Sequence, residues 1–236
     1  MEKLDVSLVL PCYNEKVTFL DSINRIMQTL DDFGRNWEII FVDDGSIDGT
    51  KELIQETIKK YPQRSLRAYF HKLNQGRGQT VIDGLLEAKG QVVGFIDIDL
   101  EVGEWYLPKF IKAIEEGADS AVAWRIYDFN LSSILRWFSS KGYSFLRQIV
   151  LGLPYKDTEG GYKFFNKKKI IPIIKKCQYK GWFWDTEIMA RIYKAGFKVK
   201  EIPVAFVRRF DKTSTVRLIP DSFAYLKDLL SFKNPK

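Results

Sequence analysis

The sequence predicts an α/β protein in which a doubly wound, mostly parallel sheet is flanked by helices. Short apolar runs alternate with segments that carry apolar residues at helical spacing. Acidic residues follow three of these runs directly, in the positions that loops at the carboxyl edge of a parallel sheet occupy. The 236 residues suffice for one such domain with a sizeable core.

The predicted strands of the first half are short apolar runs, at residues 6–10, 37–42, 66–70 and 92–96. Pro11 has no amide hydrogen to donate, so we expect it to end the first strand. Apolar residues then recur at helical spacing from Phe19 to Leu30. Further helices are expected from Thr50, and from Gly78 through Gly90.

The second half repeats the alternation less regularly. We expect strands at 163–165 and 197–207, a helix over 181–195 and a last amphipathic helix over 219–232. Residues 131–151 mix apolar side chains with basic ones, and they predict one or two amphipathic helices. These helices either pack on the sheet or face a membrane.

Three loops at the predicted strand ends carry carboxylates, at residues 11–15, 43–44 and 97–101. The carboxyl ends of parallel strands meet at one edge of the sheet, and ligands bind beyond that edge. The sequence therefore predicts one ligand site built from all three loops.

The stretch 95–101 organises this predicted site, because a strand ends there in two aspartates one residue apart. Residues i and i+2 of an extended chain point the same way, so Asp97, Asp99 and Glu101 are expected to converge on one hard cation. Mg²⁺ and Mn²⁺ prefer oxygen ligands and are often held by one or two carboxylates plus substrate phosphates. The pattern D-x-D thus predicts a metal–diphosphate site; the alternative is a polar strand end before a helix N-cap.

Charge divides the chain unevenly. Residues 1–124 carry 14 basic and 21 acidic residues, a net charge of −7, and residues 125–236 carry 23 and 9, a net charge of +14. The second half is therefore suited to anions: a phosphate, a membrane surface or a nucleic acid.

Several classes of protein are disfavoured by the composition. Two cysteines make no disulfide framework, and a lone histidine excludes clusters of histidine ligands. The glycines of Gly76-Arg77-Gly78 do not make a dinucleotide fingerprint, because Val81 stands where the third glycine belongs. We interpret them as a tight turn near a phosphate or a helix start.

Four motifs together resemble the core of glycosyltransferase family 2: P-x-Y-N-E at 11–15, V-D-D-G-S at 42–46, N-x-G-x-G at 74–78 and D-x-D at 97–99. The second half resembles the subgroup of polyprenyl-phosphate hexose synthases, which includes dolichyl-phosphate mannose synthase and dolichyl-phosphate glucosyltransferase. The matching pieces there are Arg136 with Ser140-Lys141-Gly142, D-T-E-G-G-Y-K at 157–163, W-D-T-E at 184–187 and E-I-P-V at 201–204.

The resemblance implies a GT-A-like fold in a single glycosyltransferase domain over 1–236. Residues 1–124 would bind the nucleotide-sugar and residues 125–236, with their amphipathic helices, the acceptor. It also implies Mg²⁺ or Mn²⁺ and inversion at the anomeric carbon. The implied donor-binding residues are Pro11, Tyr13, Glu15, Val42, Asp44, Asp97 and Ile98, and the implied metal-facing residues are Asp97, Asp99 and Glu101.

The implied catalytic residues are Asp99, Arg125, Arg136, Ser140 and Arg209, of which the last four would receive the acceptor phosphate and the donor diphosphate. The family's last motif has a glycine after its arginine, whereas Phe210 follows Arg209 here. Lys212 or Arg217 is expected to supply the cation that this departure leaves missing.

The acceptor decides whether a general base is needed. A lipid phosphate is largely ionised at neutral pH because its second pKa is about 6, so it needs arginines and no base. A sugar hydroxyl would need a base, and Asp157 and Asp185 are the candidates, each with a loop-anchoring or helix-capping role as the alternative. Asp43 is interpreted as a turn residue.

The resemblance implies transfer of a hexose to dolichyl phosphate, with GDP-mannose as the expected donor and UDP-glucose as the alternative. The stretch 157–163 favours the glucosyl members.

Two other functions remain as alternatives. One is transfer to a saccharide acceptor, and the other is a basic module that binds nucleic acid. The three carboxylate loops disfavour binding of nucleic acid. No uncharged run approaches the roughly 18 residues of a spanning helix. We therefore expect a cytoplasmic protein, peripheral to a membrane through its amphipathic helices or through a separate membrane subunit.

Overall fold

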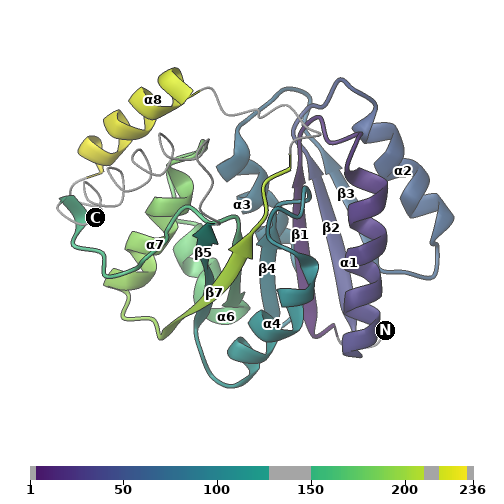
Figure 1. Ribbon diagram of the computed structural model, residues 1–236, viewed down its shortest axis with the longest axis horizontal. Helices are drawn as coiled ribbons and strands as arrows, with labels where there is room; N and C mark the ends of the chain where they lie inside the picture. Colours follow the sequence, from purple (N-terminus) through teal and green to yellow (C-terminus); the bar gives the residue numbers. More distant parts are fainter. Residues whose placement is uncertain (1–3, 128–149, 210–217, 233–236) are drawn as a thin grey trace.

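A seven-stranded sheet forms the centre of the protein, as the computed structural model in Figure 1 shows for residues 4–127, 150–209 and 218–232. Its order is β3-β2-β1-β4-β6-β5-β7. The strands are β1 (Val6–Cys12), β2 (Trp37–Asp43), β3 (Leu66–Phe70), β4 (Val92–Ile96), β5 (Ser120–Tyr127), β6 (Tyr162–Asn166) and β7 (Val199–Phe206). All pairings are parallel except those of β6, which runs antiparallel to β4 and β5. The predicted class, a mostly parallel α/β sheet, is confirmed.

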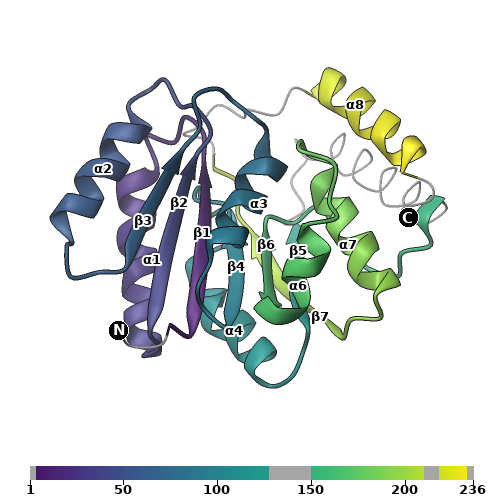
Figure 2. The same cartoon turned by 180° about the vertical axis from the view of Figure 1, so that it is seen from behind.

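Helices cover both faces of the sheet. They are α1 (Phe19–Phe33), α2 (Thr50–Lys60), α3 (Arg77–Glu87), α4 (Leu107–Glu115), α6 (Lys167–Ile174), α7 (Trp184–Lys194) and α8 (Leu218–Ser231), with a 3₁₀ turn at Glu104–Tyr106. Buried apolar residues of α1, α2 and α4 pack on one face (Figure 1), and those of α3, α6 and α7 pack on the other (Figure 2). The two apolar layers explain why β1, β2 and β4 consist mostly of apolar residues that are buried on both faces.

The strands of the first half agree with the prediction, apart from the end of β1. We expected Pro11 to stop this strand, but β1 continues to Cys12, with Pro11 opposite Val42. The pairing of β1 with β4 ends at Val9, so at Pro11 the strand has a partner on one side only. Proline is tolerated in such an edge-like position.

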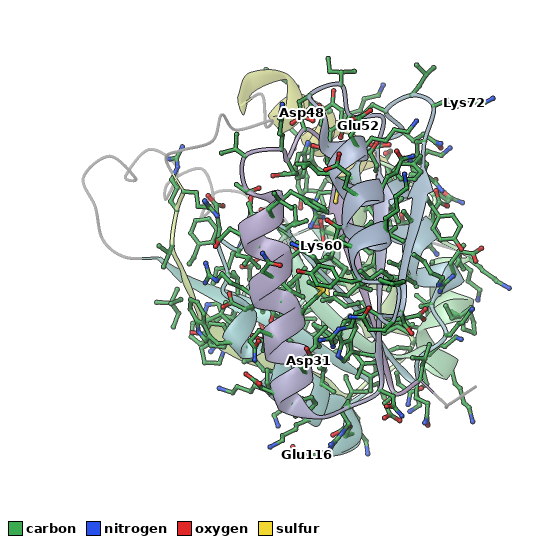
Figure 3. The ribbon with its side chains drawn as sticks, turned by 90° about the vertical axis from the view of Figure 1, so that its right-hand side faces the viewer. Asp31, Asp48, Glu52, Lys60, Lys72 and Glu116 are labelled. Carbon is green, nitrogen blue, oxygen red and sulfur yellow. The ribbon has the colours of Figure 1, made fainter. Side chains whose placement is uncertain are left out.

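The helices α4 and α6 and the strand β5 were not predicted from the sequence. The short strand expected at 163–165 is β6, and it lies between β4 and β5 with Tyr162 opposite Ile96. Because β6 is antiparallel, its amino end lies at the same edge of the sheet as the carboxyl ends of its neighbours. Figure 3 shows Asp48 and Lys72 at that end of the molecule and Glu116 at the opposite end.

Helix α8 packs against α7 through an aromatic cluster. Tyr225, Leu229 and Phe232 are buried there against Phe183. The opposite side of α8 is open to solvent, where Phe223 is 71% and Leu230 is 57% exposed. The expected amphipathic helix is therefore present at this position. The expected helices at 131–151 lie outside the described residues, apart from the last two positions. In the part of the chain that is described, no helix is both long enough and apolar enough to span a bilayer.

Candidate active site

The D-x-D loop begins directly after β4 and turns sharply. The Asp97 amide donates to the Gly161 carbonyl oxygen at 3.0 Å. Leu100 takes a positive φ of 56°, and the Glu101 amide donates to Asp99 Oδ1 at 3.2 Å. The side chain of Asp97 is 44% exposed, so its carboxylate is accessible from the edge of the sheet.

A chain of alternating charges connects Asp97 to the interior. Arg77 Nη2 lies 2.7 Å from Asp97 Oδ1, and Arg77 Nη1 donates to Asp185 Oδ2. The second oxygen of Asp185 accepts from Lys163 Nζ, which also donates to the Gly160 carbonyl oxygen. Lys163 and Asp185 are almost fully buried, with 1% and 3% of their side chains exposed. The D-x-D loop, α3, β6 and α7 are thereby joined by ion pairs.

Burial and ion pairing act in opposite directions on these two cations. Burial alone would lower the pKa of Arg77, but the charges of Asp185 and Asp97 raise this pKa above its usual value. Burial lowers the pKa of Lys163, and the ion pair with Asp185 opposes that shift. Arg77 therefore stays a cation at any physiological pH.

Glycines allow the charged groups to approach one another. A Cβ on Gly161 would lie 1.8 Å from Asp97 Oδ2 and 2.6 Å from Arg77 Nη2. A Cβ on Gly78 would lie 2.5 Å from the Cβ of Trp184 and 2.8 Å from the Lys180 carbonyl oxygen. The G-x-G pattern therefore lets the start of α3 pack against the start of α7. Arg77 is the first residue of α3.

The second acidic loop is fixed by Asp44, which is 3% exposed. Its carboxylate accepts hydrogen bonds from the amides of Gln75 and Gly76, at 2.8 and 2.9 Å. His71 Nδ1 lies 2.7 Å from Asp44 Oδ1, and His71 Nε2 lies 3.1 Å from Asp83 Oδ2. Asp44 thus holds the N-x-G-x-G loop against the end of β2. Asp43 accepts from the Ser46 amide, which agrees with its predicted turn role.

The loop after β1 is tied to the loop after β2. The Asn14 amide donates to Ser46 Oγ at 2.9 Å, and the Glu15 amide donates to Thr50 Oγ1 at 2.8 Å. Tyr13 is partly exposed beside these contacts. The side chains of Val42 and Ile98, both expected in the donor site, are instead buried in the core at 0% and 2% exposure.

Two arginines reach the same edge from β5 and β7. Arg125 pairs with Asp157 at 2.7 Å. Arg209 donates through its amide to Glu101 Oε1 at 3.2 Å and through Nη1 to the Asp99 carbonyl oxygen at 3.4 Å. The end of β7 is therefore attached to the D-x-D loop. Arg136, Ser140, Lys212 and Arg217 lie outside the described residues.

The residues at the end of β4 fit a hard divalent cation only in part. Among the residues that the structure describes, no three histidine, cysteine or acidic side chains are grouped closely enough to hold a metal ion. Glu101 accepts from the Arg209 amide, so the three carboxylates do not form a complete ligand set by themselves. Two carboxylates with substrate oxygens would suffice for Mg²⁺ or Mn²⁺. Gly161 leaves the space around Asp97 Oδ2 that a Cβ would fill.

Sequence reasoning missed three of the residues that join the site. The sequence pattern places Arg77 in a tight turn or at a helix start and Lys163 in a strand, and it assigns no site to His71. Lys163 carried a signal, because a lysine within the apolar run 162–165 is buried only when it is paired. The partners of Arg77 and His71 are far apart in sequence and carried no local signal.

Residues 7–173 match the glycosyl transferase family 2. The chain belongs to this family. The matched residues cover the three acidic loops, the D-x-D pattern and both ends of the Arg77–Asp97 ion pair. The protein is accordingly a glycosyltransferase, as the resemblance implied.

Curated relatives cover most of the chain. A dolichyl-phosphate beta-glucosyltransferase of Saccharomyces cerevisiae is 28% identical over 97% of this chain and 74% of its own. A second one, of Trichomonas vaginalis, is 30% identical over 84% of this chain and 64% of its own. Glycosyltransferase AglD of Haloferax volcanii is 28% identical over 91% of this chain, which spans only 35% of that relative.

Solved structures share the fold. Glucosyl-3-phosphoglycerate synthase of Mycobacterium tuberculosis, crystallised with UDP, superposes with a TM-score of 0.69 over 98% of this chain and 80% of its own, at 17% identity. A mannosyltransferase of Pyrobaculum calidifontis, in complex with GDP-Man and Mn²⁺, has a TM-score of 0.62 over 89% of this chain and 59% of its own, at 17% identity. The expected GT-A fold is confirmed.

Proposed function

We propose that the protein transfers glucose from UDP-glucose to a dolichyl or related polyprenyl phosphate, with inversion and with a divalent cation. Support for the sugar and the acceptor comes from the two relatives that are dolichyl-phosphate beta-glucosyltransferases. GDP-mannose, the donor expected first from the sequence, has no such support. The alternative donor, UDP-glucose, replaces it in this proposal.

A phosphate acceptor is supported by the ion pairs of Asp157 and Asp185, the two candidate general bases. Asp157 is paired with Arg125, and Asp185 is paired with Arg77 and Lys163. Burial alone would raise the pKa of Asp157, but Arg125 holds this pKa below its usual value. A carboxylate in this state is a poor acceptor for the proton of a sugar hydroxyl. A phosphate acceptor is already ionised and needs no base.

Arginines at the edge of the sheet are proposed to bind the phosphate of the acceptor. Arg125 and Arg209 reach the edge from β5 and β7, and the second half of the chain carries a net charge of +14. A guanidinium group can donate two parallel hydrogen bonds to two oxygens of one phosphate. Arginines can therefore bring a phosphate dianion close to an anionic donor. Arg136 and Ser140 are proposed to act with them, on the basis of the sequence.

Asp97 and Asp99 are proposed to hold Mg²⁺ or Mn²⁺ at the end of β4. A divalent cation in this place supplies the positive charge that a departing nucleoside diphosphate requires. The nucleoside is proposed to lie over the loops after β1 and β2, beside Tyr13 and Glu15. Two hydrogen bonds connect these loops to each other.

A lipid acceptor requires contact with a membrane surface. We propose that the protein is peripheral at the cytoplasmic face of a membrane, and that the solvent-exposed side of α8 contributes to attachment. Phe223 and Leu230 lie on that side, and apolar side chains of an amphipathic helix can insert at a bilayer interface. A separate membrane subunit is the alternative.

The test is transfer to a short polyprenyl phosphate with Mg²⁺ or Mn²⁺, using UDP-glucose and GDP-mannose side by side. We expect metal-dependent transfer from UDP-glucose, with at least a hundredfold loss in Asp99→Ala. Transfer from GDP-mannose alone would overturn the assignment of UDP-glucose as the donor.

Metal-dependent UDP binding without transfer to any lipid phosphate would overturn the assignment of the acceptor. Asp157→Asn and Asp185→Asn would then be tested with saccharide acceptors. Metal-independent, salt-sensitive RNA binding would favour the nucleic-acid alternative.

A further inference from the structure

We propose that Arg77 prevents the D-x-D carboxylates from binding a divalent cation alone, so that the cation and the nucleoside diphosphate bind together. This inference rests on the proposed function, because it concerns the metal–diphosphate site of that function. It assigns to Arg77 the role of a positioning residue that exchanges one anionic partner for another.

The first support is the position of the guanidinium group. Arg77 has 13% of its side chain exposed, whereas Asp97 has 44% exposed. Arg77 is held from below by Asp185, and its guanidinium lies over the rings of Phe95 and Trp182, at 5.5 and 5.7 Å from their centroids. The Arg77 guanidinium is therefore held in place by the protein interior, and the more accessible Asp97 carboxylate forms the ion pair from the solvent side.

The second support is the balance of charge. Asp97, Asp99 and Asp185 carry three negative charges, and Arg77 and Lys163 carry two positive ones, so this group has a net charge of −1. A divalent cation placed beside Arg77 would change that net charge to +1, and two cations in close contact repel each other. A bound diphosphate adds negative charge, so that Arg77 and the divalent cation can lie side by side without net repulsion.

The third support is that the exchange leaves no buried charge without a partner. If Asp97 turns to a cation, Arg77 retains Asp185, and Asp185 retains Lys163. Arg77 then has donors available for a diphosphate oxygen, a partner that suits a guanidinium. A buried ion pair that had to be broken outright would be strongly destabilising, but here one partner replaces another.

The experiment measures two affinities in Arg77→Met. Binding of Mn²⁺ alone is followed by the loss of the free Mn²⁺ signal in electron paramagnetic resonance, and binding of UDP in saturating Mn²⁺ is followed by calorimetry. We expect Arg77→Met to bind Mn²⁺ alone at least tenfold more tightly than the wild type. We expect the same variant to bind UDP with Mn²⁺ at least tenfold more weakly.

Two further variants separate charge from folding. Arg77→Lys keeps the charge and is expected to bind Mn²⁺ alone as weakly as the wild type. Arg67→Met breaks a comparable ion pair with the buried Glu38 on β2, at 2.7 Å, and is expected to leave both affinities unchanged. Thermal unfolding of each variant reports whether it is folded.

Opposite changes in the two affinities of Arg77→Met support the inference, because a merely structural role would weaken both. Weaker or unchanged Mn²⁺ binding in Arg77→Met overturns it. If the wild type binds neither UDP nor GDP with Mn²⁺, the proposed function fails. The measurement with Mn²⁺ alone still decides the role of Arg77.

Discussion

The guanidinium of Arg125 donates two hydrogen bonds to the carboxylate of Asp157, from Nε to Oδ2 at 2.7 Å and from Nη2 to Oδ1 at 3.1 Å. The same carboxylate accepts from the amides of Glu159 and Gly160. One buried aspartate therefore attaches the end of β5 to the loop that precedes β6. This loop also carries Gly161, whose carbonyl oxygen accepts from the amide of the D-x-D aspartate Asp97 at 3.0 Å.

Asp157→Asn should make the protein less stable at neutral pH and should remove part of its acid sensitivity. Burial alone would raise the pKa of Asp157, but Arg125, Lys163 and the Glu159 amide together lower it in the folded protein. A lowered pKa stabilises the fold above the unfolded-state pKa of about 3.9, and this contribution is lost as the pH falls through the folded-state pKa. We expect the variant to lose roughly 2 kcal/mol at pH 7.

The difference between wild type and Asp157→Asn should then shrink below about pH 4. Urea unfolding at a series of pH values measures this dependence. Asp21→Asn, which changes an exposed aspartate of α1, is the control and should show neither effect. A difference between wild type and Asp157→Asn that stays constant from pH 7 to pH 3 would contradict the assignment.

The predictability of the fold depended on how local each pattern was. The first-half strands were predicted correctly because each is an apolar run buried between two helical layers, and β4 has the predicted bounds of Val92 to Ile96. The strand β5 was missed because Arg125 interrupts its run of small and apolar residues. Its place in the sheet depends on β6 and β7, whose pairing no local pattern encodes.

The same limit applies to the site. D-x-D was recognisable because its two aspartates lie in one short stretch. The ion pair of Arg77 with Asp185 joins residues 108 positions apart, and neither residue signals the other. Glu101 was expected to converge with Asp97 and Asp99, but its carboxylate accepts from the Arg209 amide. The turn at Leu100, with its positive φ, breaks the extended geometry on which convergence of all three carboxylates depended.

Gly161→Ala should lower transferase activity at least a hundredfold. The new Cβ would lie 1.8 Å from Asp97 Oδ2, so the D-x-D carboxylate or the loop must move. A shift of about 1 Å at a reacting centre can cost a hundredfold in rate. Steady-state transfer with Mn²⁺ measures the effect. Gly181→Ala is a matched control on a neighbouring loop, since its Cβ would meet nothing within 4 Å; equal activity in the two variants would refute the steric argument.

His71→Leu should raise KM for the nucleotide-sugar more than it lowers kcat. His71 contacts Asp44 and Asp83 and so helps to hold the loop at 74–76 against β2. Loss of these contacts loosens the proposed nucleoside surface but leaves the D-x-D loop in place. We expect KM to rise about tenfold, since two hydrogen bonds are lost.

Initial rates over a range of donor concentrations separate KM from kcat for His71→Leu. Lys72→Ala changes the neighbouring residue, whose side chain points away from the protein in Figure 3. This control should keep both constants. A fall in kcat at unchanged KM in His71→Leu would place the histidine with the reacting groups instead.

Tyr225→Phe should weaken the attachment of α8 to the site. The Tyr225 hydroxyl and Thr186 Oγ1 are 2.6 Å apart, and Thr186 Oγ1 lies 3.1 Å from Thr158 Oγ1. These three buried hydroxyls connect α8 with the residues that follow Asp185 and Asp157. Removing one hydroxyl leaves a buried partner less satisfied, which costs roughly 1–2 kcal/mol of unfolding free energy.

A double-mutant cycle of Tyr225→Phe and Thr186→Val measures the coupling between the two hydroxyls through urea unfolding. We expect a coupling free energy of about 1 kcal/mol, because each single change removes the same hydrogen bond. Tyr193→Phe, at a tyrosine of α7 that is 46% exposed, should show no coupling with Thr186→Val. Additive effects of Tyr225→Phe and Thr186→Val would mean that this pair of hydroxyls contributes nothing to the attachment of α8.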